Sequence, residues 1–587
     1  MSLSLPAELT ASAWRRAGRD LMAKMLAELS YEQLLDPVAV GDNDYRVDVG
    51  GGVGYTFAAR RGAFGAWRVE PSSVLRHTAD GRQAAGTDPL QFVLDAQEKL
   101  GLSGDTAGHL VRELSATLAA DTRLLADQRT AAELADLPYA ELEGHQTGHP
   151  WLIPNKGRLG FSASDAARYV PEARRPLRLP WMAVHHSLAR YRGVEGLDAG
   201  RLLAEELDDA TTERFGALAD PAEFHWLPVH PWQWDEIVVP VFAAEVAAGR
   251  IVPLGDGPDR YLAQQSVRTF SNIDTPGRRH VKLPMSILNT LVWRGLPTER
   301  TLAAPAVTSW ILGLAAQDAF LRDETRVVLL GEVASVTVNH PVLERIPGVP
   351  YQYLELLGAI WRESIFTKLD RSEHARTLAC LLQIDCAGRP LVAELVARSG
   401  LAPREWLQRL VGALLPPLLH FLYRYGVVFS PHGENTIVVF DADYVPARLA
   451  VKDFVDDVNV SDAPLPELTD IPPDVAEVLL TEPPEMLCQF IQSGLFVGHF
   501  RYLGDLFDMH LGVAETEFWS LVRDEILAYQ KRFPELTERF TLFDLLAPDL
   551  QRLCLNRNRL LLDGYRDRPE RPHAAVHGRV PNPLHQH

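Results

Sequence analysis

Apolar residues along the first 144 positions recur with a period near 3.6, which predicts amphipathic helices. The segments 88–119 and 122–137 show this pattern. The opening segment 1–34 mixes charged residues into the same period and lacks the uninterrupted apolar core of a signal peptide. Gly50-Gly51-Gly52 interrupts the helices, and because no Gly-Lys-Ser/Thr follows, the triplet predicts a turn and not a phosphate loop. We therefore expect a helical first domain over residues 1–144.

Between residues 145 and 348 the pattern changes to short runs rich in β-branched residues. Two clear examples are 326–330 and 333–338, which lie among Gly, Pro and Asp turns. Such runs predict strands. We expect a second domain over residues 145–348 that contains a sheet.

From residue 349 to 563 helical periodicity returns around one pair of apolar runs, 436–440 and 449–454, which predicts a hairpin-like pair of strands. The most apolar window, 410–429, contains Pro416-Pro417 and the polar residues His420 and Arg424. These interruptions favour a buried core helix broken at the prolines over a membrane span. We expect a third domain over residues 349–563.

The last segment, residues 564–587, is rich in Pro and Arg. A polar terminal segment with scattered histidines is more often disordered than a metal-binding site. We therefore expect a flexible tail that carries His573, His577, His585 and His587.

Composition and charge narrow the classes of function. The chain has 587 residues, of which 47% are hydrophobic and 23% charged, which is typical of globular proteins. Its net charge of −19 opposes binding to a phosphate backbone, so we expect small-molecule partners and no nucleic acid. Four cysteines without a Cys-x-x-Cys pair encode neither a disulfide scaffold nor a structural zinc site. With no membrane segment predicted, we expect a cytoplasmic protein.

The first of four polar stretches runs from residue 143 to 161. Its Gly and Pro residues predict a loop, and His149, Lys156 and Arg158 on that loop could gather around an anion such as a triphosphate. The alternative is a loop with solvated cations.

The second polar stretch contains Ser266, Arg268 and Thr269, followed by residues 280–295. If 266–270 is a strand, Ser266 and Arg268 share one face and can point at a phosphate. Lys282, Ser286, Asn289 and Thr290 fall at helix-like offsets, and Thr290 with Arg294 makes an i, i+4 pair. This wall could bind an anionic acid. The alternative is a helix whose arginine pairs with a nearby carboxylate.

The third and fourth stretches lie at the ends of the two predicted strands of the third domain. His432-Gly-Glu434-Asn435 leads into the first strand, and Lys452-Asp453 ends the second. Carboxylates and an imidazole at neighbouring strand ends have the chemistry of a magnesium–nucleotide site. The alternative is a set of turn residues that caps a hairpin.

Together these motifs resemble the siderophore synthetases that work independently of non-ribosomal peptide synthetases, the aerobactin-synthetase-like family. The resemblance covers nearly the whole chain. Two positions depart from the family pattern: Leu152-Ile153-Pro154 replaces a second His-Pro, and Glu434 replaces a glutamine. The motifs that carry the resemblance are Gly148-His149-Pro150, Lys156-Gly-Arg158-Leu-Gly-Phe161, Leu227-Pro-Val-His230-Pro-Trp-Gln-Trp234, Ser266-Val-Arg268-Thr269, Lys282, Arg294, His432-Gly-Glu434-Asn435 and Lys452-Asp453-Phe454.

The resemblance implies an α+β, hand-shaped fold with a helical thumb, antiparallel-sheet fingers and a mixed α/β palm, usually as a homodimer. It also implies a two-step reaction. ATP and a carboxylic acid give an acyl-adenylate and pyrophosphate, and an amine or hydroxyl then displaces AMP to form an amide or ester. The protein must offset repulsion between carboxylate and phosphate, which needs cations and Mg²⁺ around the phosphates.

The same resemblance assigns roles to individual residues. We expect His149, Arg268 and Lys282 to be catalytic, Thr290, Arg294 and His432 to bind the acid, and Glu434 and Asp453 to hold the metal. The expected ATP-binding residues are Lys156, Ser266, Arg268, Thr269, Lys282, His432, Asn435 and Asp453.

The segment 282–295 is most similar to the citrate-using achromobactin-synthetase type, so citrate is the expected acid. Residues 263–269 and Trp232-Gln233-Trp234 also resemble desferrioxamine-type synthetases, which join and cyclise succinyl-hydroxamate monomers. That alternative stays open.

Two other classes of function compete with the synthetase. A kinase-like phosphotransferase also pairs a His-Gly loop with a later metal Asp, but it places its catalytic Asp about four residues before the Asn, whereas Glu434 directly precedes Asn435. A non-catalytic iron-handling protein with an iron–sulfur centre in its C-terminal half would need a cysteine cluster, and Cys554 stands alone in its segment.

Overall fold

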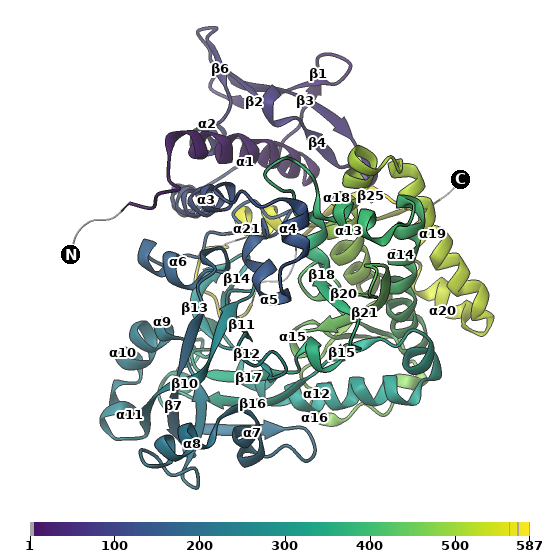
Figure 1. The fold of residues 1–587 in the computed structure, drawn as a ribbon. Coiled ribbons are helices and arrows are strands. Elements are labelled where there is room, and N and C mark those ends of the chain that lie inside the picture. The colour runs from purple at the N-terminus through teal and green to yellow at the C-terminus, as the bar shows by residue number, and fades with distance from the viewer. Residues whose placement is uncertain (1–4, 563, 572–574, 586–587) are drawn as a thin grey trace.

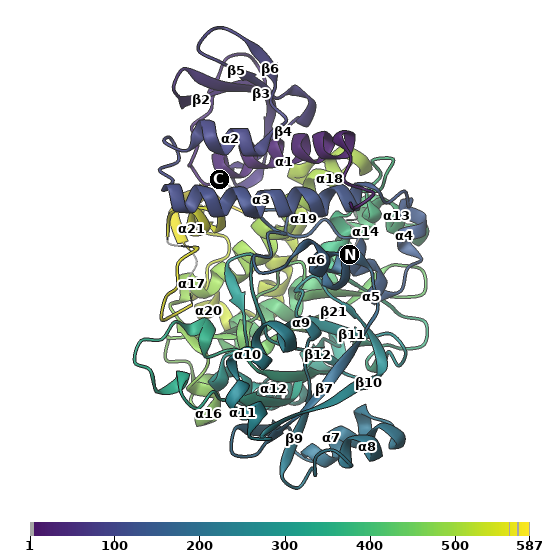
Figure 2. The ribbon, with the colours of Figure 1, turned by 90° about the vertical axis from the view of Figure 1, so that its left-hand side faces the viewer.

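The computed structural model describes residues 5–562, 564–571 and 575–585, and it is an α+β structure as predicted. Figure 1 shows a small N-terminal sheet at one end, a large sheet at the other, and a mainly helical region with a third sheet beside them. The long helices α1 (Ala11–Tyr31) and α3 (Gly104–Leu125) lie beneath the N-terminal sheet, as the turned view in Figure 2 shows.

The prediction that residues 1–144 are helical is wrong for residues 38–85, which form an antiparallel sheet between α1 and α2 (Pro89–Ala96). The alternation of Tyr55, Phe57 and Ala59, all buried, is the period-two signal for one of its strands. Gly50-Gly51-Gly52 forms the turn predicted for it, with φ of 102°, 59° and 74° that favour glycine. The strands are β1 (Val38–Ala39), β2 (Asp44–Gly50), β3 (Val53–Arg61), β4 (Trp67–Val69), β5 (Leu75–His77) and β6 (Gln83–Ala85).

The middle of the chain forms the large sheet, whose eight strands run in the order β8-β16-β17-β12-β11-β10-β7-β9 and pair antiparallel throughout. One central strand, β17, lies beyond residue 348, so the sheet crosses that predicted boundary. The strands are β7 (Leu177–His185), β8 (Ala189–Gly193), β9 (Phe224–Pro228), β10 (Ile251–Ala263), β11 (Thr269–Asn272), β12 (His280–Lys282), β16 (Glu332–Val338) and β17 (Gly358–Arg362).

The two faces of this sheet differ in chemistry because side chains alternate along each strand. Phe270, Val281 and Trp361 point into an apolar core on one side. Their chain neighbours Lys282 and Arg362 are therefore on the other side, where they are buried as well. This second face is polar and lies toward the third sheet.

The third sheet has the order β15-β21-β20-β18. The predicted hairpin is confirmed, since β20 and β21 pair antiparallel. Helix α15 (Phe454–Asp457) follows β21 and contacts α12 (Thr298–Gln317). The strands are β15 (Val328–Leu330), β18 (His374–Thr377), β20 (Thr436–Phe440) and β21 (Pro446–Lys452).

The apolar window 410–429 holds the buried helix α14 (Pro403–His420), but the expected break at Pro416-Pro417 is absent and the helix runs through both prolines. Leu414, Leu415 and Leu418 around them are buried in the main core, and this packing outweighs the backbone hydrogen bonds that prolines cannot donate. Among the described residues, no helix combines the length and apolar character needed to span a membrane.

The prediction of a flexible tail is wrong for its described part. Strand β25 (Ala575–Pro581) pairs antiparallel with β24 (Asp549–Cys554), and Leu584 is fully buried. His577 and His585 belong to this ordered part, whereas His573 and His587 lie outside the described residues.

A buried ion pair holds the C-terminal helix α21 (Leu555–Leu561) against α3. Arg559 donates to Glu113 at 2.5 and 3.1 Å, both side chains are 0% exposed, and the Tyr565 hydroxyl donates to the same carboxylate at 2.6 Å. The C-terminal segment is thus part of the packing of the N-terminal helices.

We predict that Arg559→Ala lowers the free energy of unfolding by about 3–5 kcal/mol, because it leaves Glu113 as an uncompensated buried charge. The measurement is urea denaturation of the ligand-free protein. The control is Arg579→Ala, which removes a pair with Asp549 whose side chains are both 47% exposed and should cost less than about 1 kcal/mol. Equal effects of the two substitutions would contradict the assignment.

Candidate functional site

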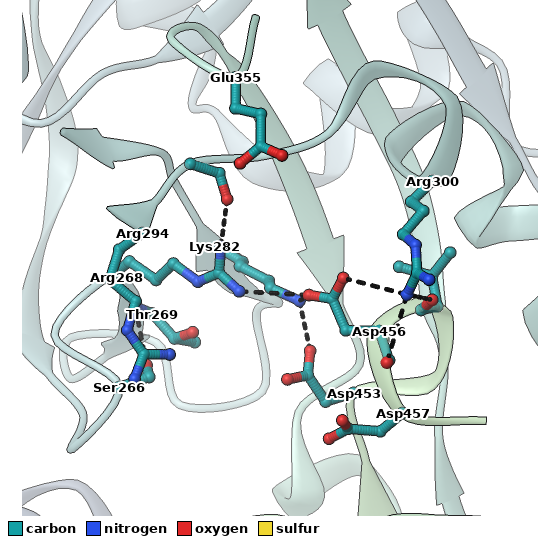
Figure 3. Close-up of polar contacts among 12 residues, drawn as sticks. Ser266, Arg268, Thr269, Lys282, Arg294, Arg300, Glu355, Asp453, Asp456 and Asp457 are labelled. Carbon is teal, nitrogen blue, oxygen red and sulfur yellow. Dashed lines mark hydrogen bonds and ion pairs between the residues drawn. The ribbon is translucent and has the colours of Figure 1, made fainter. Parts of the chain in front are cut away.

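The centre of the candidate site is Lys282, the last residue of β12. Its Nζ contacts the carboxylates of Asp453 and, at 2.8 Å, of Asp456, as Figure 3 shows. It also contacts the carboxylate of Glu332 at 3.4 Å. Burial alone would favour the neutral amine, but the three carboxylates outweigh it and raise the pKa of Lys282. The ammonium therefore joins the large sheet to the start of α15.

Arg268, in the turn between β10 and β11, reaches the carboxylate of Asp456. Its guanidinium donates to the carbonyl of Gly295 and, at 3.2 Å, to Asp456 Oδ2, as Figure 3 shows. Arg571, from the C-terminal segment, donates to the Gly295 carbonyl at 3.2 Å. Burial would raise the pKa of Asp456, but Lys282 and Arg268 hold it well below its usual range. Asp456 is therefore the shared anion of this cluster, and the sequence analysis missed it.

The pKa of the next residue, Asp457, shifts the opposite way. Burial and the charges of Asp453 and Asp456 raise the pKa of Asp457 well above its usual range, although Asn435 Nδ2 donates to it. The pKa values of these two adjacent aspartates thus shift in opposite directions, because Asp456 forms ion pairs with Lys282 and Arg268 and Asp457 accepts from Asn435 instead.

Ser266 and Arg268 do not share the face of a strand, contrary to the prediction. They lie in the turn between β10 and β11, where Val267 has a φ of 70° and Ser266 Oγ accepts from the Thr269 backbone at 3.2 Å. Positive φ at a β-branched residue is costly and is found mostly at functional sites. Ser266, Arg268 and Thr269 therefore lie close together because of this turn, and not because side chains alternate along a strand.

Glu143 holds this turn from outside the sheet. Its carboxylate accepts from the Gln265 backbone at 2.9 Å and from Thr377 at 3.1 Å, and its carbonyl accepts from the Gln265 side chain at 2.5 Å. Burial raises the pKa of Glu143. In the sequence, Glu143 stands out only as the first residue of a polar stretch.

The helix-like offsets within residues 282–294 do not correspond to a helix. The segment is the end of β12 followed by the hairpin of β13 (Met285–Asn289) and β14 (Val292–Arg294). The Thr290–Arg294 pair exists nevertheless, because the hairpin turn, with Thr290 at φ 58°, brings the hydroxyl to the guanidinium. Arg294 Nε donates to the Asn289 carbonyl at 3.2 Å.

Arg294 differs from the other arginines of the site in having neutral partners only. Within the described part of the chain it forms no ion pair, and burial together with the charge of Arg268 lowers the pKa of Arg294 to about 10. Both His432 and Glu434 are close enough to interact with it electrostatically. A bound anion would supply the negative counter-charge that this guanidinium lacks.

His149 also belongs to this neighbourhood. Burial, aided by Lys24, His432 and Arg294, lowers the pKa of His149 to about 3, so its imidazole is neutral at physiological pH. Nδ1 of His149 accepts from the backbone of Trp151 and Leu152, and Lys24 donates to its carbonyl at 2.7 Å. The loop is therefore pinned by α1.

The two other cations of that loop are already paired. Lys156 Nζ donates to Asp121 at 2.9 Å, and Arg158 forms a buried ion pair with Glu172. Within the described part of the chain, no hydrogen bond or ion pair joins Lys156 to the Lys282 cluster, so its expected role toward a triphosphate stays a prediction.

The donor set fits magnesium only in part. Among the described residues no group of three or more His, Cys, Asp or Glu could hold a metal ion by itself. Glu434 is half-buried, and no hydrogen bond or ion pair of its carboxylate exists within the described residues. Because Mg²⁺ is usually held by one or two carboxylates together with substrate phosphates, Glu434 and Asp453 suit a metal that is shared with a bound nucleotide.

Sequence comparison agrees with this arrangement. Residues 138–383 match the IucA / IucC family, and residues 404–568 match the ferric iron reductase FhuF-like transporter family. The chain is similar to the rhizobactin siderophore biosynthesis protein RhbF of Rhizobium meliloti (strain 1021), with 41% identity over 99% of this chain and 97% of the relative. The chain therefore belongs to the IucA/IucC family of siderophore synthetases.

Two further relatives and one solved structure extend the comparison. The aerobactin synthase of Escherichia coli is 35% identical over 92% of this chain and 93% of its own. A Bacillus anthracis ligase named citryl-spermidine/3,4-dihydroxybenzoyl-citryl-spermidine:spermidine ligase is 28% identical over 88% and 84%. The structure of aerobactin synthetase IucC from Klebsiella pneumoniae matches with a TM-score of 0.85 and 32% identity, over 98% of each chain. The predicted fold class is confirmed.

The match over residues 404–568 bears on the iron-handling alternative. Cys380, Cys488 and Cys554 are buried free thiols and Cys386 is an exposed one. An iron–sulfur centre requires clustered cysteine thiolates, and the described residues contain no such cluster.

We predict that Asp456→Asn destabilises the ligand-free protein by about 1–3 kcal/mol, since Lys282 and Arg268 lose a buried charged acceptor. Asp457→Asn is the matched control. Its carboxyl is already expected to be protonated, so the amide should change stability by less than about 0.5 kcal/mol. Thermal and urea unfolding at pH 7 measure both, and a larger loss for Asp457→Asn would refute the charge assignment.

Proposed function

We propose that this synthetase adenylates a carboxylic acid, preferably citrate, and condenses the acyl-adenylate with an amine or hydroxyl. The observation that carries the proposal is Arg294, a half-buried guanidinium whose only partners among the described residues are the neutral oxygens of Asn289 and Thr290. A substrate carboxylate would complete it with a two-point, charge-assisted interaction. The relative whose name contains "citryl" supports citrate as the acid.

The cations of the site suit the first half-reaction. Attack of a carboxylate on the α-phosphate brings two anions together, and the charge on the leaving pyrophosphate increases in the transition state. Lys282 and Arg268 lie beside the Arg294 hairpin and would neutralise the phosphates. Nucleotide phosphates would compete with Asp456 for both cations. Bound Mg²⁺, held by Asp453 and Glu434, would offset further negative charge.

The neutral histidines suit the acid. His432 and His149 lie in the electrostatic neighbourhood of Arg294, and burial lowers the pKa of both imidazoles. Neutral imidazoles can donate to a carboxylate or hydroxyl without adding a charge that would repel Arg294. A tricarboxylate with a hydroxyl group, such as citrate, uses several such donors.

A desferrioxamine-type activity on succinyl-hydroxamate monomers is the second candidate. Such a substrate has one carboxylate. It would bind Arg294 but leave some of the hydrogen-bonding groups of Thr290, His149 and His432 without a substrate partner. Pyrophosphate release with citrate, 2-oxoglutarate and a succinyl-hydroxamate amine supplied in turn separates the two. Release with the hydroxamate and none with citrate would replace the citrate assignment.

We predict that Arg294→Ala lowers acid-dependent pyrophosphate release about 30-fold or more. The truncation leaves a substrate carboxylate unpaired in a desolvated site, at a cost of about 2–5 kcal/mol, and about 1.4 kcal/mol corresponds to tenfold. Arg294→Lys should recover only part, since an ammonium cannot make the planar two-point contact. AMP binding, measured by calorimetry, should stay within twofold. Full activity of Arg294→Ala would show that Arg294 does not bind the substrate acid.

We predict that Asp453→Asn reduces adenylation at least tenfold and raises the Mg²⁺ concentration needed for half-maximal rate, because the amide is a weaker metal ligand. Asparagine is preferred to alanine here, since Asp453 has a φ of 74° and Asn tolerates that conformation better. Thermal unfolding shows whether the fold survives. An unchanged Mg²⁺ dependence would rule out Asp453 as a ligand.

A further inference from the structure

The described C-terminal segment, residues 564–571, ends beside the hairpin of β13 and β14. The Arg568 carbonyl accepts from the backbone of Tyr351 at 3.1 Å, and the Arg571 guanidinium carbon lies 5.7 Å from the centroid of the Tyr351 ring. The Tyr351 hydroxyl in turn accepts from the backbone of Trp293, in β14, at 3.1 Å. The segment that the sequence indicated as a flexible tail is therefore attached to the hairpin proposed to bind the acid.

Arg571 forms a forked ion pair with Glu355 at the end of this hairpin. Its Nε donates to Oε1 at 3.0 Å and its Nη2 to Oε2 at 2.5 Å, and the Glu355 side chain is buried. A planar guanidinium that a carboxylate holds at two points has a defined orientation. Nη2 also donates to the Gly295 carbonyl at 3.2 Å. The ion pair therefore places a donor against the residue that directly follows Arg294.

The end of the hairpin packs closely on Glu355. A Cβ on residue 295 would lie 2.3 Å from the Glu355 Cβ and 2.7 Å from its carbonyl oxygen, so the backbone of Gly295 can approach only because it has no side chain. The Leu296 backbone donates to the same Glu355 carbonyl at 3.1 Å. The hairpin itself is a separate two-stranded sheet, and two strands alone are marginally stable. Its position therefore depends on these neighbours.

The Gly295 carbonyl accepts from two guanidinium groups that differ in what else they bind. Arg268 donates to it and is also paired with Asp456, and in the proposed reaction Arg268 would turn toward phosphates. Arg571 is paired with Glu355 instead. A carbonyl has two lone pairs and can accept from both donors. If a bound nucleotide draws Arg268 away, Arg571 still holds this carbonyl.

The pair of Arg571 and Glu355 acts on Arg294 mainly through position. After burial and Arg268, the charge of Arg571 also lowers the pKa of Arg294, so the two guanidinium groups are near each other. Because Glu355 pairs with Arg571, however, the pair adds little net charge beside Arg294. Its influence on a bound acid must then come from where it holds the hairpin.

We propose that Arg571, oriented by Glu355, is a positioning residue that holds the end of the hairpin and thereby sets the affinity of the site for its carboxylic acid. This inference rests on the proposed acid-binding role of Arg294. Arg571 acts through the Gly295 carbonyl and not by contact with the acid. A two-point contact between guanidinium and carboxylate is sensitive to orientation, so a displaced hairpin weakens acid binding more than nucleotide binding.

The test compares wild type with Arg571→Lys and with the double variant Arg571→Met/Glu355→Gln. Lysine keeps the charge but cannot form the fork. The double variant removes both charges, so it leaves no uncompensated buried carboxylate and stays folded if the lysine variant does not. Thermal unfolding checks the fold. Pyrophosphate release is measured with whichever of citrate, 2-oxoglutarate and a succinyl-hydroxamate amine the wild type uses.

Both variants should raise the KM for the acid at least tenfold, keep kcat within threefold, and bind ATP without acid within twofold of wild type by calorimetry. A wild-type KM for the acid in either folded variant would overturn the proposal. Equal losses of acid and ATP affinity would also overturn it, because they indicate a merely structural ion pair. A lower kcat at unchanged KM would overturn it as well and would place Arg571 at the reacting atoms.

The matched control is Arg539→Met on α20 (Thr537–Leu542). Arg539 donates to Glu467 at 2.9 Å, both residues are half-buried, and Arg539 has no other partner among the described residues. This variant should lose some stability and keep the wild-type KM for the acid. If wild type releases no pyrophosphate with any of the three acids, the proposed adenylation fails. Calorimetric binding of citrate to the same variants then decides the positioning role, with tenfold weaker binding expected and equal or absent binding overturning it.

Discussion

The ion cluster around Lys282 is the interaction on which the arrangement of the site depends. It joins β12 of the large sheet to Asp453 and Asp456 at the end of the third sheet, two segments more than 170 residues apart. A buried ammonium with three carboxylates tolerates little displacement, since each charge is satisfied only in one geometry. The relative position of the two sheets, and with it the space between them, therefore follows from this contact.

The large sheet can serve both the core and the site because its strands alternate. Phe270, Val281 and Trp361 fill an apolar core, and the residues beside them in sequence carry hydroxyl, amino and guanidinium groups to the opposite face. The functional groups thus stand on a rigid support, which keeps their spacing when a ligand binds. The cost is a polar face that must be buried, and the third sheet with its facing carboxylates offsets that cost.

Local pattern predicted the third-domain hairpin, the strand-end position of Asp453 and the Thr290–Arg294 pair. Local pattern gave wrong predictions where contacts between distant parts of the chain determine the local conformation. Ser266 and Arg268 lie in a strained turn held by Glu143, from another part of the chain, and no periodicity encodes that contact. Helix-like offsets over 282–294 arose by chance from two short strands and their turn. Asp456 and Arg362 gave no signal, because a single charged residue in an apolar segment has meaning only beside its partners.

The cations between the two sheets fall into two groups that differ in what holds them. Lys282 and Arg268 are compensated by carboxylates and are stable without ligand. Arg294 and Lys452 have no counter-ion in the described chain. The first group fixes the relative position of the two sheets, and the second adds positive charges that have no ion-pair partner among the described residues. An anionic ligand would supply this missing counter-charge without first displacing every internal ion pair.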